Sequence, residues 1–147
     1  MRKNRRLPFK NKSRYAVVVD GQTEFWYLKM IQRNERNLKI DIRPELPQRK
    51  KISDQYEKVL SLSEEYDKVL WIVDLDVILK ESNLQMFLDF DKKLSEIKNV
   101  LTIINQPCLE YWFLLHFKFT APHFSNCGEA EKLLKSYLGT YSKSQKY

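Results

Sequence analysis

Apolar runs of strand length alternate along the chain with segments in which apolar residues recur every three or four positions. The runs predict three strong strands and a weaker, alternating strand near a sheet edge: residues 15–20, 68–74 and 100–105, and residues 38–43. The periodic segments predict helices at residues 23–34, 53–65, 84–97, 107–117 and 129–138. Because strands and helices alternate, the pattern predicts an α/β fold with a mainly parallel sheet of about four strands flanked by helices.

The length of 147 residues, 43% of them hydrophobic, suits a single domain. We place this domain at residues 15–147, after an N-terminal arm of residues 1–14. No apolar run approaches the ~20 residues of a membrane-spanning helix, and the basic N-terminus lacks the apolar segment of a signal peptide, so we expect a cytoplasmic protein. Cys108 and Cys127 are too few for a disulfide framework, and we expect reduced thiols.

Positive charge is concentrated before the first strand. Seven basic residues and no acid precede Tyr15: Arg2, Lys3, Arg5, Arg6, Lys10, Lys12 and Arg14. Because the whole chain has 26 basic and 19 acidic residues, the remainder is formally neutral, with 19 of each. A flexible basic arm suits non-specific contact with nucleic-acid phosphates, and equally a role in solubility alone. A second basic cluster, a weaker candidate for such contact, follows Pro44 and Pro47 in a predicted loop: Arg49, Lys50 and Lys51.

Acidic residues follow the strong strands. Asp20 closes the first, Asp74 and Asp76 close the next, and Glu110 lies in the first turn of the helix after the last. In open α/β sheets the functional crevice lies beyond the carboxyl ends of the strands, so these carboxylates are the candidate site.

The spacing of Asp74 and Asp76 turns both side chains to one side if the chain stays extended, and two close carboxylates repel each other unless a cation is present. Hard oxygen ligands of this kind suit Mg²⁺. Glu110 has a simpler explanation in the helix dipole, but it lies on an apolar helix, where a buried carboxylate needs a partner. At the first helix, Thr23 is positioned to cap and Glu24 is favoured by the dipole.

The cysteines and histidines offer a second metal hypothesis. Cys108, His116, His123 and Cys127 are separated by seven, six and three residues, which matches no common zinc pattern. We expect His116, on an apolar helix, to be a hydrogen-bonded core residue. The chain has three glycines, no glycine-rich phosphate loop and no nucleophile elbow.

Three blocks of the sequence resemble the motifs of one family. Residues 20–27 read DGQTEFWY and resemble an E-G-x-T-E-x-x-Y block, and residues 70–76 read LWIVDLD and resemble a strand that ends in D-x-D. Residues 105–117 read NQPCLEYWFLLHF and are similar to an N-x-P-C-x-E-x-W-x-L-L-H-F block, the most specific of the three. On these blocks the chain resembles the RloB-like proteins, whose fold is similar to the TOPRIM domain of topoisomerases, primases and overcoming-lysogenization-defect nucleases.

The resemblance implies hydrolysis of phosphodiester bonds in RNA or DNA with Mg²⁺ or Mn²⁺, in bacterial defence against phage, including abortive infection. By this resemblance Asp20 acts as general base or metal ligand, Asp74 and Asp76 hold the metal, and Glu110 completes a second site. Three residues take supporting positions: Thr23, Glu24 and Asn105. The implied partners are nucleic acid and a regulatory protein of the defence system such as an ATPase, and a homo-oligomer is left open.

The chain departs from the family pattern at two points. The first-block acid is usually glutamate, whereas Asp20 is one methylene shorter. The chain also ends soon after Ser142, earlier than many members, so we expect a shortened C-terminus.

Two other functions stay open. One is a catalytically degenerate TOPRIM-like module that binds nucleic acid or a defence partner without cutting, which Asp20 favours. The other is a haloacid-dehalogenase-like phosphatase, since residues 73–79, VDLDVIL, resemble its nucleophile strand. In that case Asp74 is the phosphorylated residue and Asp76 the acid/base.

Overall fold

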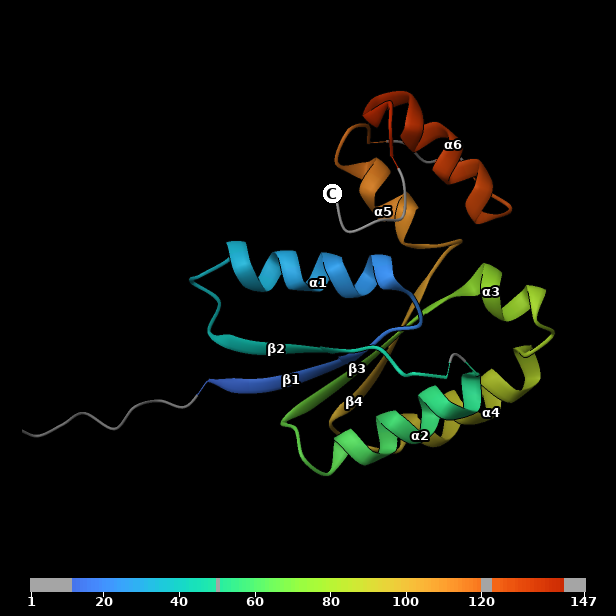
Figure 1. Cartoon of the computed structure of the whole chain (residues 1–147). Coiled ribbons are helices and arrows are strands. Elements are labelled where there is room, and N and C mark those ends of the chain that lie inside the picture. The colour runs from blue at the N-terminus through green and yellow to red at the C-terminus, as the bar shows by residue number, and fades with distance from the viewer. Residues whose placement is uncertain (1–11, 50, 120–122, 142–147) are drawn as a thin grey trace, which may run out of the picture.

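The computed structural model describes residues 12–49, 51–119 and 123–141. The elements (Figure 1) are β1 (Ser13–Val18), α1 (Gln22–Asn34), β2 (Ile40–Glu45), α2 (Ile52–Ser63), β3 (Lys68–Asp74), α3 (Leu75–Lys80), α4 (Leu84–Ser95), β4 (Val100–Asn105), α5 (Leu109–Leu115) and α6 (Cys127–Leu138). Within the described residues, no helix has the length and apolar character needed to cross a membrane.

The four strands form one all-parallel sheet in the order β2-β1-β3-β4. β1 lies inside it, with Val17 opposite Pro44 on one side and Leu70 on the other. Pro44, expected in a loop, lies within β2, because an edge strand tolerates its missing N–H. The chain goes from β1 to one neighbour and then to the other, so the topological switch point lies between β1 and β3. The predicted α/β architecture is confirmed.

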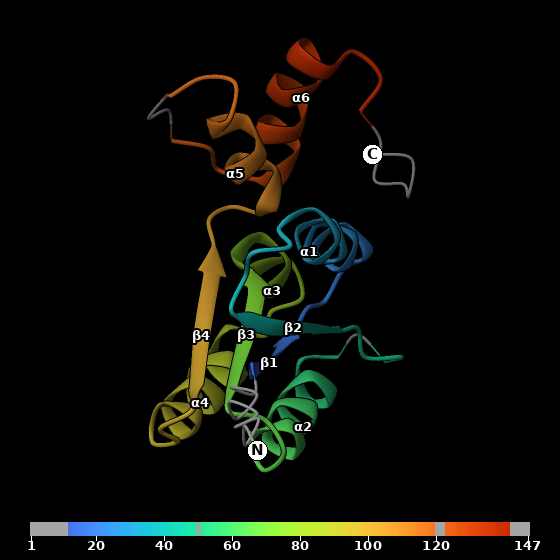
Figure 2. The ribbon, with the colours of Figure 1, turned by 90° about the vertical axis from the view of Figure 1, so that its left-hand side faces the viewer.

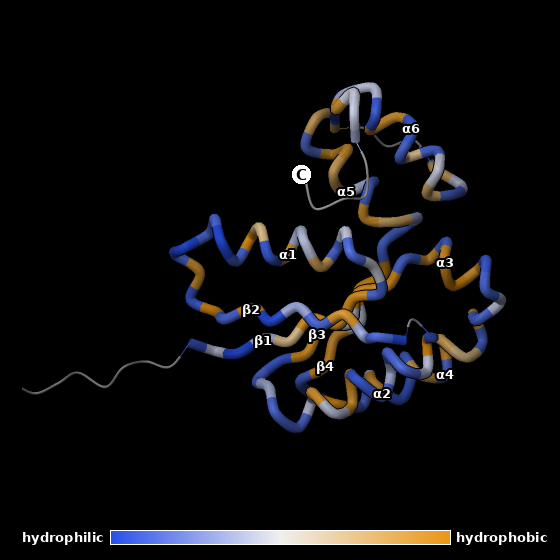
Figure 3. Tube along the Cα trace, viewed as in Figure 1, coloured by the Kyte–Doolittle hydropathy of each residue, from blue (hydrophilic) through white to orange (hydrophobic). Residues whose placement is uncertain are grey.

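Helices cover both faces of the sheet (Figure 1, Figure 2). α2 and α4 pack on one face, where Trp71, Phe87 and Leu94 are almost fully buried. The Trp71 indole N–H donates to the buried Gln55 side-chain oxygen at 2.9 Å, so the indole keeps a hydrogen bond inside the core. α1 lies on the other face and packs Leu28 against β1. Figure 3 shows the apolar residues gathered in the central strands.

The α5–α6 hairpin lies beyond the carboxyl ends of the strands (Figure 1). It has a small core of its own, which includes the buried Leu114 and Leu134. α6 begins two residues before its predicted start because the Asn126 side chain caps it, its Oδ1 accepting the Glu129 N–H at 3.2 Å. The hairpin therefore forms a roof over the edge of the sheet at which the predicted acids lie.

The helices differ from the predictions at two places. α1 is capped by Gly21, whose backbone is extended with φ of −128°, so Thr23 lies inside the first turn and does not cap. α3 was not predicted at all, because its six residues are too short for a periodic signal. Since α3 begins at Leu75, the chain does not stay extended from Asp74 to Asp76.

The boundary of the basic arm also needs correction. β1 begins at Ser13, so Arg14 belongs to the sheet. Its backbone N–H donates to Asp67 Oδ2 at 2.7 Å, and its guanidinium donates to the Glu65 carbonyl at 2.6 Å. The second bond occupies the guanidinium group that was expected to contact phosphate. Some of the other basic candidates lie outside the described residues: Arg2, Lys3, Arg5, Arg6, Lys10 and Lys50.

Two leucines of α4 offer a matched test of the core. Leu94 is 1% exposed and Leu88 is 48% exposed on the same helix. We expect Leu94→Ala to lower the free energy of unfolding by about 2–5 kcal/mol, because it leaves a cavity beneath the sheet. Leu88→Ala should change it by no more than about 0.5 kcal/mol. Urea denaturation measures both values, and equal losses would contradict the assigned core.

Candidate metal centre

Three carboxylates meet where β1 and β3 end. Asp20, Glu24 and Asp74 each offer an oxygen, and these oxygens all lie within 4.8 Å of one another. Asp20 follows β1, Glu24 lies in the first turn of α1, and Asp74 is the last residue of β3. Glu24 and Asp74 are buried, and Asp20 is half-buried. We call this group the acidic trio.

Glu24 belongs to the trio, although the sequence reasoning gave it a supporting position only. The backbone at Gly21 makes room for it, since a Cβ built on Gly21 would collide with Glu24 Oε2. Gly21 has an extended φ that other residues can adopt, so its role is space for this carboxylate. The spacing of one helical turn from Asp20 to Glu24 was the available signal, but the favourable interaction of a first-turn glutamate with the helix dipole gave a simpler explanation of Glu24.

The electrostatics of the trio favour a cation. Burial, followed by repulsion from Glu24, raises the pKa of Asp74 to about 8. A hydrogen bond from the Asn105 amide to Asp74 Oδ1 at 2.9 Å acts in the opposite direction, whereas Asp20 and Glu110 add further repulsion. Because Asp74 resists ionisation beside two other carboxylates, a divalent cation that neutralises the group would stabilise it. These hard oxygen donors fit Mg²⁺ or Mn²⁺.

Asp76 does not join the trio. Because α3 starts at Leu75, the Asp76 carboxylate points to other partners, and its Oδ2 accepts from Lys80 Nζ at 3.2 Å and from the Cys127 backbone N–H at 3.3 Å. Oδ1 is buried with no hydrogen-bond partner among the described residues. The side-by-side arrangement expected for Asp74 and Asp76 required an extended chain and is absent from this structure.

Glu110 lies in the first turn of α5, close enough for its charge to act on Asp74 of the trio. It is 1% exposed, and its Oε1 accepts from the Tyr141 hydroxyl at 3.1 Å. Burial and the Glu110 carboxylate raise the pKa of Tyr141 well above its usual range, so this hydroxyl keeps its proton. Sequence reasoning gave no signal for Tyr141, because 31 residues separate it from Glu110.

The expectation of reduced thiols is wrong for this structure, in which Cys108 and Cys127 form a disulfide with Cα atoms 5.5 Å apart. The packing of the hairpin brings Cys108, the N-cap of α5, next to Cys127, the first residue of α6. The two cysteines are 19 residues apart in the sequence, so local spacing does not predict this contact. His116, expected in the core, is exposed, and its ring makes a T-shaped contact with that of Trp112. His123 is exposed as well.

The hairpin is attached to the body through aromatic residues. The Trp112 indole N–H donates to the Tyr27 hydroxyl at 2.9 Å, and the ring of Tyr27 lies 5.3 Å from that of Phe113. Tyr27 and Trp112 come from two of the motif blocks, so this contact joins those blocks beside the trio.

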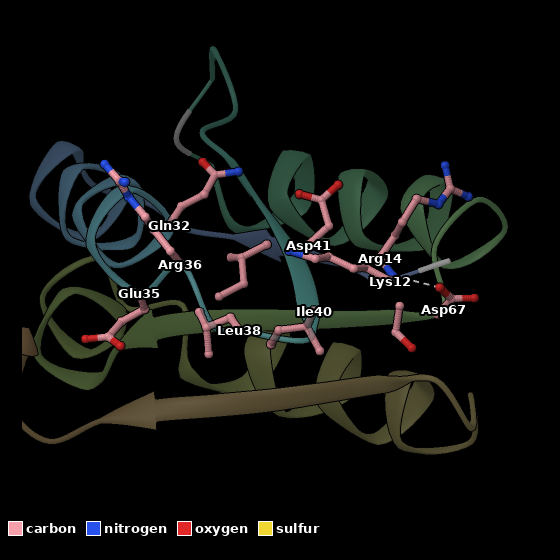
Figure 4. Close-up of a pocket in the computed structure, with 11 residues that line it drawn as sticks. Lys12, Arg14, Gln32, Glu35, Arg36, Leu38, Ile40, Asp41 and Asp67 are labelled. Atoms are coloured by element: carbon pink, nitrogen blue, oxygen red, sulfur yellow. Dashed lines mark hydrogen bonds between the residues drawn. The ribbon is translucent and has the colours of Figure 1, made fainter. Parts of the chain in front are cut away.

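One hollow among the described residues lies away from these acids. Its volume is about 780 Å³, and it is found near the amino ends of β1 and β2 (Figure 4). Its charged lining is mixed in sign: Lys12, Arg14, Glu35, Arg36, Asp41 and Asp67. Size alone therefore does not identify the functional site, and the acidic trio is the better candidate on chemical grounds.

The raised pKa of Asp74 predicts how the metal-free protein responds to pH. When folding raises the pKa of a carboxyl group, the free energy of unfolding falls as pH rises, here from about pH 4 to about pH 8. We expect Asp74→Asn to remove this loss and to stabilise the metal-free protein at pH 8 by several kcal/mol, since one pKa unit is worth about 1.4 kcal/mol.

Urea denaturation at pH 5 and pH 8 in EDTA, with and without Mg²⁺, provides the measurement. Mg²⁺ should stabilise the original chain at pH 8 and have no such effect on Asp74→Asn. Exposed Asp89, changed to Asn, is the matched control. A variant that is no more stable than the original chain at pH 8 would contradict the assigned repulsion.

Comparison with protein families gives one match. The model of the family described as RloB-like protein matches residues 15–147, nearly the whole chain. Comparisons with curated proteins and with solved structures gave no match. The matched region contains the acidic trio, Asp76, Glu110 and both cysteines, and the chain belongs to the RloB-like protein family.

Proposed function

We propose that the chain is a metal-dependent nuclease that hydrolyses phosphodiester bonds of RNA or DNA in bacterial defence against phage. The observation that carries the proposal is the acidic trio, three carboxylates within 4.8 Å at the switch point of a parallel sheet. Membership of the RloB-like family supports it through the TOPRIM-like resemblance of the same blocks. A bound Mg²⁺ or Mn²⁺ would lower the pKa of a water and neutralise charge on the scissile phosphate.

The residues of the trio differ in their suitability for each role. Glu24 and Asp74 are buried and would hold the cation. The Asn105 amide binds one oxygen of Asp74 and so orients the carboxylate, whose other oxygen would bind the cation. Asp20 is half-buried and therefore the member that solvent reaches most easily, which suits a metal ligand that also accepts a proton from water.

Positive charge for the substrate is available at the same edge of the sheet. The loop after β2 leaves this edge and carries exposed Arg49 and Lys51. Ile52, directly after Lys51, lines a small hollow together with Asp20. Phosphates held by these residues would lie beside the trio. This arrangement favours a nucleic-acid substrate.

The observations give the other two functions less support. The phosphatase requires Asp76 as acid/base beside Asp74, but Asp76 is hydrogen-bonded to Lys80 and Cys127. The degenerate binding module rests on Asp20 in place of glutamate, and Glu24 supplies the trio with a longer acid from the same block.

A cleavage assay tests the proposal directly. Purified full-length protein is incubated with end-labelled single-stranded RNA, transfer RNA, and single- and double-stranded DNA, each with Mg²⁺, Mn²⁺ or EDTA. We expect metal-dependent cleavage of at least one substrate, and a loss of about 100-fold or more in Asp74→Asn, because the cation loses a charged ligand. Asp89→Asn should cleave like the original chain. Binding without cleavage under all conditions would instead indicate the degenerate module.

The role of Gly21 gives a second test. In Gly21→Ala the added methyl group would displace the Glu24 carboxylate from the trio. We expect Mg²⁺ affinity and cleavage to fall by about 10–100-fold while the fold is retained. The matched change is Gln22→Ala, on the next residue, whose side chain is exposed and directed to Trp26. Calorimetric titration of Mg²⁺ measures the affinity. Equal Mg²⁺ affinities of the two variants would contradict the claim that Gly21 leaves room for the Glu24 carboxylate.

A further inference from the structure

A second cluster of potential ligands lies in the roof and does not belong to the acidic trio. Cys108, Glu110 and Cys127 each offer a ligand atom, and these atoms all lie within 4.8 Å of one another. Cys108 and Glu110 are 1% exposed, and Cys127 is 8% exposed. They come from the N-cap of α5, the first turn of α5 and the first residue of α6.

The contact between Cys127 and Glu110 has a different meaning in each redox state. Glu110 Oε2 lies 3.2 Å from Cys127 Sγ. A disulfide sulfur has no proton to donate, so the oxidised pair places a sulfur against a carboxylate without a hydrogen bond. In the reduced state the thiol can donate to Glu110, or both groups can bind a cation. The environment therefore suits the reduced pair better than the disulfide.

An independent observation points to a ligand at the same place. Asp76 is 7% exposed, and its Oδ1 has no hydrogen-bond partner among the described residues. Its Oδ2 accepts the backbone N–H of Cys127 at 3.3 Å, so the carboxylate lies against one of the two cysteines. A buried oxygen without a partner is costly, and a cation beside Cys127 would satisfy it.

We propose that Cys108 and Cys127, when reduced, bind Zn²⁺ together with Glu110, with Asp76 as the fourth ligand, and that the disulfide is the metal-free state of the same site. Thiolates select Zn²⁺ over the hard cations that suit the acidic trio. A dithiol reductant supplies two electrons and two protons to the disulfide and is itself oxidised to a disulfide. Zn²⁺ then displaces the two thiol protons. A two-electron oxidant such as a peroxide, reduced to water or an alcohol, re-forms the disulfide and releases Zn²⁺.

For the two cysteines and Glu110 the geometry requires only small movements. Tetrahedral Zn²⁺ with Zn–S of ~2.3 Å and Zn–O of ~2.1 Å separates two sulfurs by about 3.8 Å, and a sulfur and an oxygen by about 3.6 Å. The Cys127 sulfur and the Glu110 oxygen are already 3.2 Å apart. The two sulfurs must separate after reduction, and the Cα atoms, 5.5 Å apart, let rotation of the side chains achieve this. This proposal does not depend on the nuclease activity.

Cobalt spectroscopy tests the site in the full chain. Co²⁺ is added to metal-free protein kept reduced with a phosphine, and the thiolate-to-cobalt charge-transfer bands are recorded. We expect charge-transfer bands of the intensity of one thiolate-bound Co²⁺ per chain, Zn²⁺ to abolish them, and the oxidised protein to show no such bands. Absence of charge-transfer bands in the reduced protein would overturn the proposal and leave the pair as a disulfide only.

Variants identify the ligands. Cys108→Ser and Cys127→Ser should each lower Zn²⁺ affinity by 100-fold or more, and Glu110→Gln and Asp76→Asn by about 10–100-fold, in competition with a chromogenic chelator. His116→Ala and His123→Ala, at the exposed histidines, should bind Zn²⁺ like the original chain. Circular dichroism checks that each variant folds. Loss of affinity in the histidine variants, or retention in folded cysteine variants, would refute this ligand set.

Discussion

Parallel pairing of β1 with β3 is the constraint on which the rest of the structure depends. The register sets Val18 opposite Trp71, so both strands end at the same edge of the sheet and deliver Asp20 and Asp74 to one place. The first turn of α1 adds Glu24. The core formed by Trp71 and its neighbours stabilises this pairing, and the burial that it provides keeps the carboxylates poorly solvated. Hydrophobic packing thus holds together groups that repel one another.

The α5–α6 hairpin completes this edge as a roof. It is attached to the body by the contact of Trp112 with Tyr27. It also buries Glu110 between two chemical environments: the trio, whose Asp74 feels its charge, and the cysteine pair, whose Cys127 touches it. The carboxylates of the trio therefore lie on the sheet side of Glu110 and the two cysteines on the roof side. The proposed metals divide along the same boundary.

The strand predictions succeeded where a long apolar run has only one way to be buried. β3 and β4 have the predicted bounds. Consecutive apolar residues suit the buried β3, which lies inside a covered sheet, whereas β4 is an edge strand that leaves Leu101 and Ile104 about half exposed. Local spacing predicted less well at helix starts. Thr23 has the chemistry of a cap, but the chain enters α1 one residue after Gly21. The start of α3 at Leu75 likewise separated Asp74 from Asp76, because the backbone conformation after a strand decides where the second acid points.

The sequence by itself determined the α/β class, the parallel sheet and the edge at which the acids gather, because these follow from periodicity and from the direction of the strands. Only the tertiary structure decided which carboxylates meet. It placed Glu24 in the trio, directed Asp76 to the roof, and joined Cys108 to Cys127 across 19 residues. Such contacts depend on how α1 and α6 pack in three dimensions, and the local spacing of residues does not predict that packing.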